Sequence, residues 1–243
     1  MSTRAADIWV FLSASPLLGL TLTLIVYHAA VTIQGWLKGH ALANPVLLSV
    51  ATLSMLLWLT GTPYATYFEG AQFVHFLLGP ATVALAIPLY AQFDRLRRLA
   101  LPIGLALLAG SLAAAFSAVL IGKLFGASTP TLISLAPKSA TTPIAMGIAE
   151  RLGGLPSLTA VLVILTGILG AICAAPLFRL LRIADPGVRG FALGVASHGI
   201  GTARAFQDSE QAGAFAALAM GLNGLATALL LPLLLPLLLR WLA

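Results

Sequence analysis

The segment Pro137-Lys138-Ser139-Ala140-Thr141-Thr142-Pro143 places a lysine, three hydroxyl side chains and two prolines inside an otherwise apolar stretch of chain. Each proline lacks a backbone N–H and disfavours helical geometry in the residue before it, so a continuous helix is not expected here. Backbone that leaves the helical state at membrane depth must be surrounded by protein or water. If the flanking segments span a bilayer, this segment is predicted to be a broken or re-entrant helix beside a polar pathway.

The composition indicates that the chain's main solvent is a bilayer. Of the 243 residues, 60% are hydrophobic and 8% are charged, and the mean hydropathy is +1.02. Soluble domains carry about 25% charged residues. The net charge of +6 fits the excess of Lys and Arg in cytoplasmic loops of membrane proteins, and no basic face interleaved with aromatic residues predicts nucleic-acid binding. Cys173 is the single cysteine, which excludes a disulfide within the chain.

Long apolar segments predict an all-α, polytopic membrane protein of about six to eight helical segments. Segments long enough to cross the hydrocarbon core occur at 8–33, 41–60, 71–93, 99–125, 155–178 and 213–239. Two shorter segments rich in small residues, 131–149 and 190–206, are predicted to be broken or re-entrant helices. The first long segment follows a weakly basic leader and exceeds the length of a signal peptide, so we expect a retained membrane helix.

Basic connectors predict the orientation of these segments. Residues 94–98 and 179–182 hold the densest arginines, which the positive-inside rule places on the cytoplasmic side. Three apolar segments separate the two connectors, so the middle one, 131–149, is expected to enter and leave on the same side.

We expect a single membrane domain over residues 1–243, with repeat halves at about 41–125 and 126–243. The repeat is suggested by Leu78-Gly79-Pro80 and Leu135-Ala136-Pro137, each followed by a Leu-Pro pair at the start of a long segment. The alternative is that Gly-Pro and Ala-Pro pairs are simply common in membrane helices.

Lys138 and the hydroxyls of Ser139, Thr141 and Thr142 predict a binding site for an anion. A lysine at membrane depth costs about 2.5–3.5 kcal/mol on insertion scales and rarely persists without a partner or a water-lined cavity. An interrupted helix also presents free N–H groups and a positive dipole end that suit a carboxylate. The alternative is that the hydroxyls bond to their own helix while the lysine reaches an interface.

A second polar cluster, Ser197-His198-Gly199-Ile200-Gly201-Thr202-Ala203-Arg204, is predicted to belong to the same site. Its glycines allow a close approach of backbone to a helix or ligand, and Arg204 is suited to clamp a carboxylate. His198 titrates near neutral pH and is a candidate proton carrier, while Ser197 and Thr202 offer hydroxyls. The alternatives are that His198 is a hydrogen-bonded packing residue and that Arg204 lies at a helix end beside the acidic residues that follow it.

Other polar residues carry weaker predictions. Asn44, which precedes a proline, and Thr82 are candidates for lining the pathway, whereas Asn223 is expected to serve helix packing. No Gly-x-Ser-x-Gly or His-Glu-x-x-His string occurs, no carboxylate in an apolar segment is available to orient His198, and no metal-ligand spacing is present. We therefore expect no enzyme, no metal and no cofactor, with a proton or sodium as a possible coupling ion.

Three strings, in this order, resemble the LrgB/CidB family of bacterial inner-membrane proteins. They are Pro137-Lys138-Ser139-Ala140-Thr141-Thr142-Pro143-Ile144-Ala145, Gly153-Gly154-Leu155-Pro156-Ser157-Leu158-Thr159-Ala160 and Ser197-His198-Gly199-Ile200-Gly201-Thr202-Ala203-Arg204-Ala205. The resemblance implies a multi-pass protein of the cell inner membrane with one of two roles. One role is an antiholin- or holin-like regulator of murein hydrolase activity and lysis, and the other is transport of pyruvate, glycolate or glycerate, the last two being moved by the plastid relative.

The residues favour the transport role, because buried cations on interrupted helices are costly and suit the selective handling of a small monocarboxylate. We therefore expect a secondary transporter, or a transporter subunit, that binds a small carboxylate. The resemblance further implies a small LrgA/CidA-like membrane protein as a partner, and we expect contact with membrane lipid and with further copies of the chain.

Overall fold

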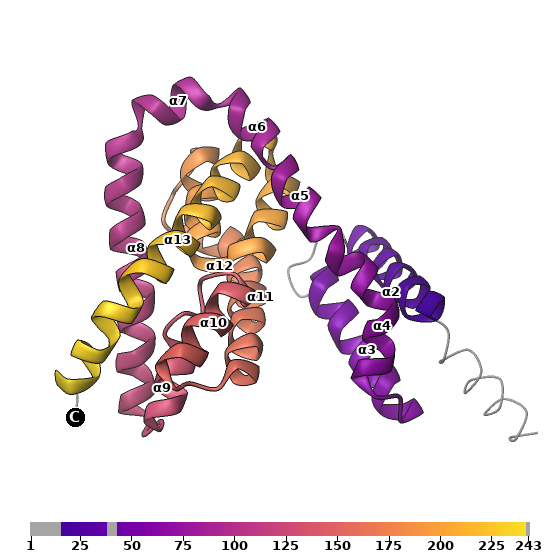
Figure 1. Cartoon of the computed structure of the whole chain (residues 1–243). Helices are drawn as coiled ribbons and strands as arrows, with labels where there is room; N and C mark the ends of the chain where they lie inside the picture. The colour runs from indigo at the N-terminus through magenta and orange to yellow at the C-terminus, as the bar shows by residue number, and fades with distance from the viewer. Residues whose placement is uncertain (1–15, 38–42, 242–243) are drawn as a thin grey trace, which may run out of the picture. The chain divides into compact units, whose positions relative to one another are not determined.

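The computed structural model describes residues 16–37 and 43–241, which form helices joined by short turns, with no strand among them. Four of these helices are long and apolar enough to cross a membrane: α2 (Pro16–Trp36), α8 (Ala100–Leu124), α11 (Pro156–Leu180) and α13 (Glu210–Trp241) (Figure 1). The prediction of an all-α, multi-pass membrane protein is confirmed. Residues 8–15 of the first predicted segment lie outside the described residues.

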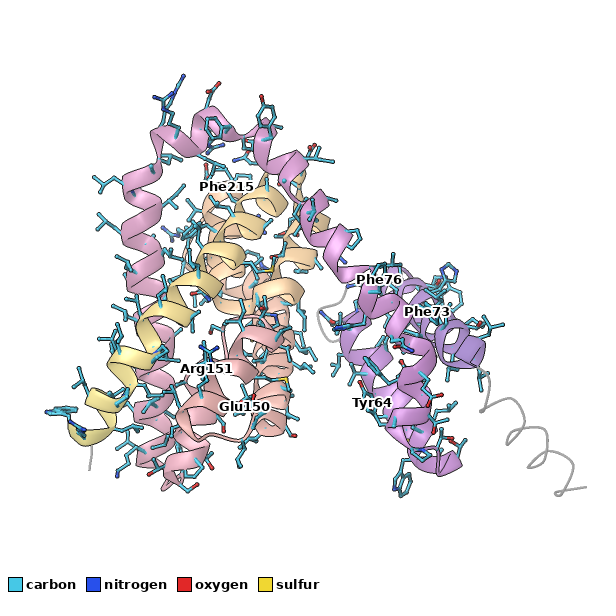
Figure 2. All side chains as sticks on the ribbon, in the orientation of Figure 1. Tyr64, Phe73, Phe76, Glu150, Arg151 and Phe215 are labelled. Carbon is cyan, nitrogen blue, oxygen red and sulfur yellow. The ribbon has the colours of Figure 1, made fainter. Side chains whose placement is uncertain are left out.

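The chain divides into two units, Met1–Ala84 and Leu85–Ala243. In the first unit, α2 packs on α3 (Pro45–Thr60) and α4 (Tyr64–Phe76), and the short helix α5 (Leu78–Ala84) follows. The hydroxyls of Thr23 and Tyr67 share a hydrogen bond of 2.7 Å between α2 and α4. Aromatic side chains of α4, among them Tyr64, Phe73 and Phe76, are exposed (Figure 2). The single membrane domain and its repeat halves stay predictions.

The predicted long helix over 71–93 is wrong. The structure has instead the end of α4, then α5, α6 (Ala86–Ala91) and the start of α7 (Phe93–Arg98). Two of the helices end four residues before a proline, α4 at Phe76 before Pro80 and α5 at Ala84 before Pro88. A proline has no N–H for the carbonyl four residues earlier, and its ring crowds that carbonyl, so the helix stops there.

The second unit contains one arrangement twice: a 25-residue apolar helix followed by a helical hairpin. Helix α8 is followed by α9 (Thr129–Leu135) and α10 (Thr142–Leu152), which form the first hairpin with its tip at 136–141. Helix α11 is followed by α12 (Pro186–Asp208), which is broken at His198 and forms the second hairpin. At about 1.5 Å per residue, α8 and α11 are each about 37 Å long, enough to cross a bilayer core of about 30 Å.

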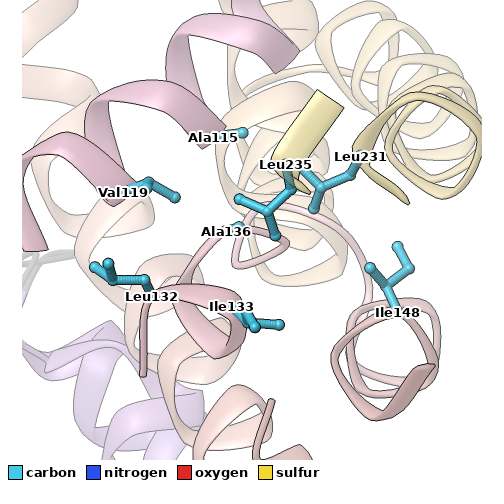
Figure 3. Packing of buried hydrophobic residues seen from close by; sticks show 8 residues of the cluster. All are labelled: Ala115, Val119, Leu132, Ile133, Ala136, Ile148, Leu231 and Leu235. Atoms are coloured by element: carbon cyan, nitrogen blue, oxygen red, sulfur yellow. The ribbon is translucent and has the colours of Figure 1, made fainter. Parts of the chain in front are cut away.

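The first hairpin returns to the side from which it starts. The backbone N–H of Leu155, beyond the end of α10, donates to Ser134 Oγ on α9 at 2.7 Å. This hairpin is held by a buried apolar cluster from four helices: Ala115 and Val119 of α8, Leu132, Ile133 and Ala136 at α9, Ile148 of α10, and Leu231 and Leu235 of α13 (Figure 3).

The two arms of α12 also lie side by side. Arg189 Nη2 and Asp208 Oδ2, which belong to opposite ends of α12, form an ion pair of 3.0 Å. The hairpin packs closely on α13, where a Cβ on Gly194 would overlap the carbonyl of Ala216, so only glycine allows this approach. The prediction of broken or re-entrant helices at 131–149 and 190–206 is therefore confirmed by the interruptions at 136–141 and at His198.

The two hairpins enter the second unit from opposite ends. The first has its base beside the start of α11, through Ser134 and Leu155, and beside the end of α8, where Gly122 meets Leu132. The second has its base beside the end of α11, where the Arg189 guanidinium lies 5.4 Å from the Phe178 ring centroid. We call these two ends the α9 end and the α7 end.

Both basic connectors lie at the α7 end, as the charge pattern predicted. Arg95 Nη2 on α7 is 2.9 Å from Asp185 Oδ2, which caps the start of α12. Figure 2 shows Phe215 near this end, and Glu150 and Arg151 of α10 farther from it.

Candidate functional site at the hairpin tips

One side chain of α13 joins the two hairpin tips. Asn223 is 1% exposed, and its Nδ2 donates to the carbonyl of Ser139 at 3.0 Å and to the carbonyl of Val195 at 3.2 Å. Its Oδ1 accepts a hydrogen bond from Ser111 Oγ of α8. A single buried amide therefore ties the tip of the first hairpin, the end of the first arm of α12 and the middle of α8 together.

The tip of the first hairpin carries the predicted anion-binding residues. Lys138 is half-buried, and its Nζ donates to Ser139 Oγ at 3.3 Å. Among the described residues, no carboxylate oxygen lies within 4.0 Å of this ammonium group. Helix α10 begins here at Thr142, and Thr141 occupies the N-cap position without a side-chain cap. The tip therefore offers an unpaired cation and the free N–H groups of a helix N-terminus.

The tip of the second hairpin is a strained turn in which Ser197 and His198 are buried. His198 has φ 42° and ψ −132°, outside the regions that non-glycine residues favour. Its Nε2 is 2.9 Å from the carbonyl of Val163 on α11, which anchors the ring. Thr202, buried one turn later, donates its hydroxyl to the carbonyl of His198 at 2.9 Å.

Ser197 is the polar group of this tip that is left without a partner. Its side chain is 0% exposed, and Ser197 Oγ has no hydrogen-bond partner among the described residues. A Cβ on Gly170 of α11 would overlap this oxygen, so glycine at that position leaves the space that the hydroxyl occupies. Buried polar groups are rarely left unpaired, which marks Ser197 as a group available to a ligand.

Each tip is also the point where one helical arm ends and another begins. Helix α9 and the first arm of α12 direct their C-terminal carbonyls toward the tips, while α10 and the second arm of α12 begin there with N-terminal N–H groups. A helix N-terminus attracts anions, and a C-terminus attracts cations. The two tips together can therefore receive a carboxylate and, beside it, a cation.

The structure places Arg204 on the second arm of α12, about 9 Å of helix rise beyond the tip. Its guanidinium pairs with Asp208 Oδ1 at 3.1 Å and donates to Gln207 Oε1 at 3.1 Å. Arg204 therefore lies near a helix end beside an acidic residue, which is the alternative that the sequence allowed for it. A role of Arg204 in substrate binding stays a prediction.

Asn44 and Thr82 belong to the first unit. Asn44 is buried, and its Oδ1 accepts from the N–H groups of Val46 and Leu47 at 2.9 and 3.2 Å, so it caps α3. Thr82 lies on α5, and its side chain is outside the described part of the chain. Pathway roles for both residues stay predictions.

Three groups near the tips and the α7 end were missed as functional candidates by sequence reasoning. Asn223 was expected to serve helix packing, and its hydrogen bonds to α8 and to both hairpins confirm this. Its position at the tips was not predicted, although an amide within a long apolar segment is itself a signal of a buried polar contact. Ser111 carries no sequence signal. Asp185 lies in a connector. The hydrogen bond from the N–H of Val188 has the largest effect on its carboxyl and lowers the pKa below its usual range, and the guanidinium of Arg95 lowers it further. Partial burial acts in the opposite direction.

The described residues contain no group of three His, Cys, Asp or Glu side chains placed to hold a metal ion. The hairpin tips offer hydrogen-bonding groups, the ammonium group of Lys138 and helix ends. This set can bind a small anion and release it without a covalent step.

Comparison with known proteins agrees with the strings seen in the sequence. Residues 23–237 match the model of the LrgB-like family. The chain is 39% identical over 219 residues to the uncharacterized protein YwbG of Bacillus subtilis strain 168, covering 90% of this chain and 97% of that protein. It is 30% identical over 222 residues to antiholin-like protein LrgB of Bacillus cereus and of Bacillus anthracis, covering 91% of this chain and 96% of those proteins. No solved structure matches.

Proposed function

The chain belongs to the LrgB-like family, and we propose that it is a secondary transporter, or the transporting subunit of a larger complex, for small monocarboxylates such as pyruvate, glycolate or glycerate. The observation that carries this proposal is the meeting of two opposed hairpin tips at Asn223, beside the unpaired ammonium group of Lys138.

Broken helices that meet inside a membrane protein are typical of secondary transporters, whose half-helix N-termini point at anionic substrate groups. The energetic cost supports the same reading, because a cation at membrane depth costs about 2.5–3.5 kcal/mol on insertion scales and is usually retained for function. A protein that only forms a membrane lesion needs association between copies and no such site.

In the proposed mechanism, Lys138 attracts the carboxylate, and the hydroxyls of Ser139, Thr141 and Thr142 bind its oxygens. The unpartnered hydroxyl of Ser197 is the hydrogen-bonding group of the opposite tip that we assign to the substrate. Charge-assisted hydrogen bonds of this kind are about twice as strong as neutral ones.

Coupling is assigned to His198 or to a cation at the helix ends. The imidazole of His198, whose Nε2 lies 2.9 Å from the carbonyl of Val163, is the protonatable group that we assign to a proton-coupled cycle. Sodium is the other coupling ion compatible with carbonyl groups at the tips. Alternating access requires the Asn223 contacts to one tip to break while the contact to the other persists.

The orientation follows from the distribution of charge along the second unit. The α7 end carries Arg95, Arg97, Arg98, Arg179, Arg182 and Arg189, whereas the α9 end carries Lys123, Arg151 and Arg240. By the positive-inside rule, we propose that the α7 end faces the cytoplasm. The cell inner membrane is the proposed location of the chain. An LrgA/CidA-like membrane protein, membrane lipid and a second copy of the chain are the proposed partners.

The second candidate is an antiholin-like regulator of lysis, which the names of the Bacillus cereus and Bacillus anthracis relatives favour. This role and transport differ in one measurable property, since a transporter moves its substrate selectively while the bilayer stays closed to other solutes. A lesion passes unrelated solutes of similar size.

Proteoliposomes that contain an entrapped dye and purified protein separate the two candidates. We expect saturable uptake of radiolabelled pyruvate or glycolate without dye release, loss of uptake in Lys138→Ala, and retained uptake in Lys123→Ala, which removes an exposed lysine at the end of α8. The assay is run with and without the small membrane partner. Dye release by wild type and by Lys138→Ala alike, without selective uptake, would overturn the transport proposal and support the regulator.

A further inference from the structure

A cavity of about 670 Å³ lies between α8 and the first arm of α12. Arg95, Asp185 and Phe215 line it at the α7 end. At its inner end it is lined by Val195 and Ala196, the residues just before the second hairpin tip. The cavity therefore extends along the helices from the α7 end to the place where Asn223 holds the carbonyl of Val195.

The two walls of the cavity come close to each other at Gly110 of α8, and side chains connect them at the α7 end. A Cβ on Gly110 of α8 would lie 3.1 Å from Val195 Cγ1, so the two helices are close there. At the α7 end, Arg95 connects to the α12 wall through its ion pair of 2.9 Å with Asp185. The same guanidinium lies 5.4 Å from the ring centroid of Phe215, so one side chain contacts both α12 and α13.

We propose that this cavity is the cytoplasmic access route to the hairpin tips and that the Arg95–Asp185 pair, with Phe215, is its gate. This inference rests on the proposed function. The walls are formed by apolar and small side chains such as Ile103, Ala106 and Ala192, which offer no group that would hold a carboxylate. A permeating anion must bind strongly enough to enter and weakly enough to leave, so such walls suit passage and leave binding to the tips.

The gate is suited to open at low cost. Arg95 and Asp185 keep 40% and 45% of their side-chain surface exposed, and such exposed ion pairs are weak and screened by salt. An approaching carboxylate has the same charge as Asp185 and competes with it for the guanidinium. The entering anion therefore opens the ion pair by replacing Asp185 as the partner of the Arg95 guanidinium.

Cysteine accessibility tests the route without requiring transport. In a Cys173→Ser background, which removes the chain's single cysteine, Ala106→Cys and Ala192→Cys place a thiol on each wall. Leu105→Cys is the matched control, because Leu105 is 61% exposed on α8 and does not line the cavity. Each variant is reconstituted in vesicles of known orientation and treated with a membrane-impermeant thiosulfonate.

We expect both wall thiols to be labelled from the α7 side and not from the α9 side, while the control thiol stays unlabelled until the protein is denatured. Adding Arg95→Ala is expected to raise the labelling rate of the wall thiols about two- to fivefold, the effect of removing a weak exposed ion pair. An unchanged rate in Arg95→Ala would overturn the gate.

Labelling of the wall thiols only by a membrane-permeant reagent would show that lipid chains fill the cavity and would overturn the route. Carboxylate uptake with unlabelled walls would overturn the route and leave the proposed function standing. Labelled walls without uptake of any monocarboxylate would overturn the proposed function and with it the assignment of the cavity as a substrate route.

Discussion

Replacing Asn223 by leucine tests the join between the two hairpin tips. Leucine keeps a similar side-chain volume, but it leaves the carbonyls of Ser139 and Val195 and the hydroxyl of Ser111 without their partner. The site depends on these hydrogen bonds of Asn223. No other side-chain hydrogen bond that the structure describes connects Ser139 with the residues beside the second tip.

The expected magnitude follows from these three hydrogen bonds. Interhelical hydrogen bonds in membrane proteins contribute about 0.6 kcal/mol each on average, so Asn223→Leu is predicted to lower the free energy of unfolding by about 2 kcal/mol. Unpaired buried groups in soluble proteins cost about 1–3 kcal/mol each, and water entering at the tips reduces that cost. For a chain of this size, the loss corresponds to a melting temperature lower by about 4–8 °C.

Thermal unfolding in detergent micelles and amide hydrogen exchange measure the effect. We expect faster exchange at residues 136–141 and 197–201 and no change in α3. Thr159→Val is the control, because Thr159 is equally buried, and its hydroxyl bonds at 3.1 Å to Leu155 next to its own helix. Equal melting temperatures and equal exchange in Asn223→Leu and Thr159→Val would show that Asn223 does not join the two tips.

Two further predictions concern the second hairpin. Gly170→Ala places a methyl group where Ser197 Oγ lies, so we expect the free energy of unfolding, measured by thermal unfolding, to fall by about 1–3 kcal/mol. Gly147→Ala is the control, because its methyl group meets open space and should cause no such loss. Equal effects of the two variants would contradict the close contact between Gly170 and Ser197. The pKa of Asp185 is lower in the closed gate than in the unfolded chain, so the ionised carboxylate stabilises the closed gate. This stabilisation is complete above the pKa of the unfolded carboxyl and is lost as the pH falls through the lower pKa of the folded state. We therefore expect the cavity thiols to be labelled faster in that acid range because Arg95 loses its partner, once their rates are divided by the rate at which free cysteine reacts with the same reagent at each pH. An Asp185→Asn variant should lose this pH dependence.

Much of the second unit could be predicted from local features of the sequence. Apolar length predicted α8, α11 and α13, and the proline and glycine positions around Lys138 and His198 predicted the two interruptions. The breaks in 71–93 were missed, although they follow from Pro80 and Pro88 by the same local rule.

The candidate site depended on contacts that no local pattern contains. Asn223 is 84 residues from Ser139 and 28 from Val195 in the sequence, and only the opposed entry of the hairpins brings these groups to one amide. Arg204 illustrates the converse, because an acidic residue four positions later is a local partner, and the structure shows that pair.

Binding of radiolabelled pyruvate to purified protein, measured by scintillation proximity, tests the central claim that the hairpin tips hold the carboxylate. Lys138→Gln removes the charge at the tip, and Arg151→Gln, the control, removes an exposed charge elsewhere on the same hairpin (Figure 2). A hydrogen bond to a charged group contributes about 1.5–3 kcal/mol, so we predict that Lys138→Gln weakens binding by about 10- to 150-fold while Arg151→Gln binds as wild type does. Wild-type affinity in Lys138→Gln would contradict the account.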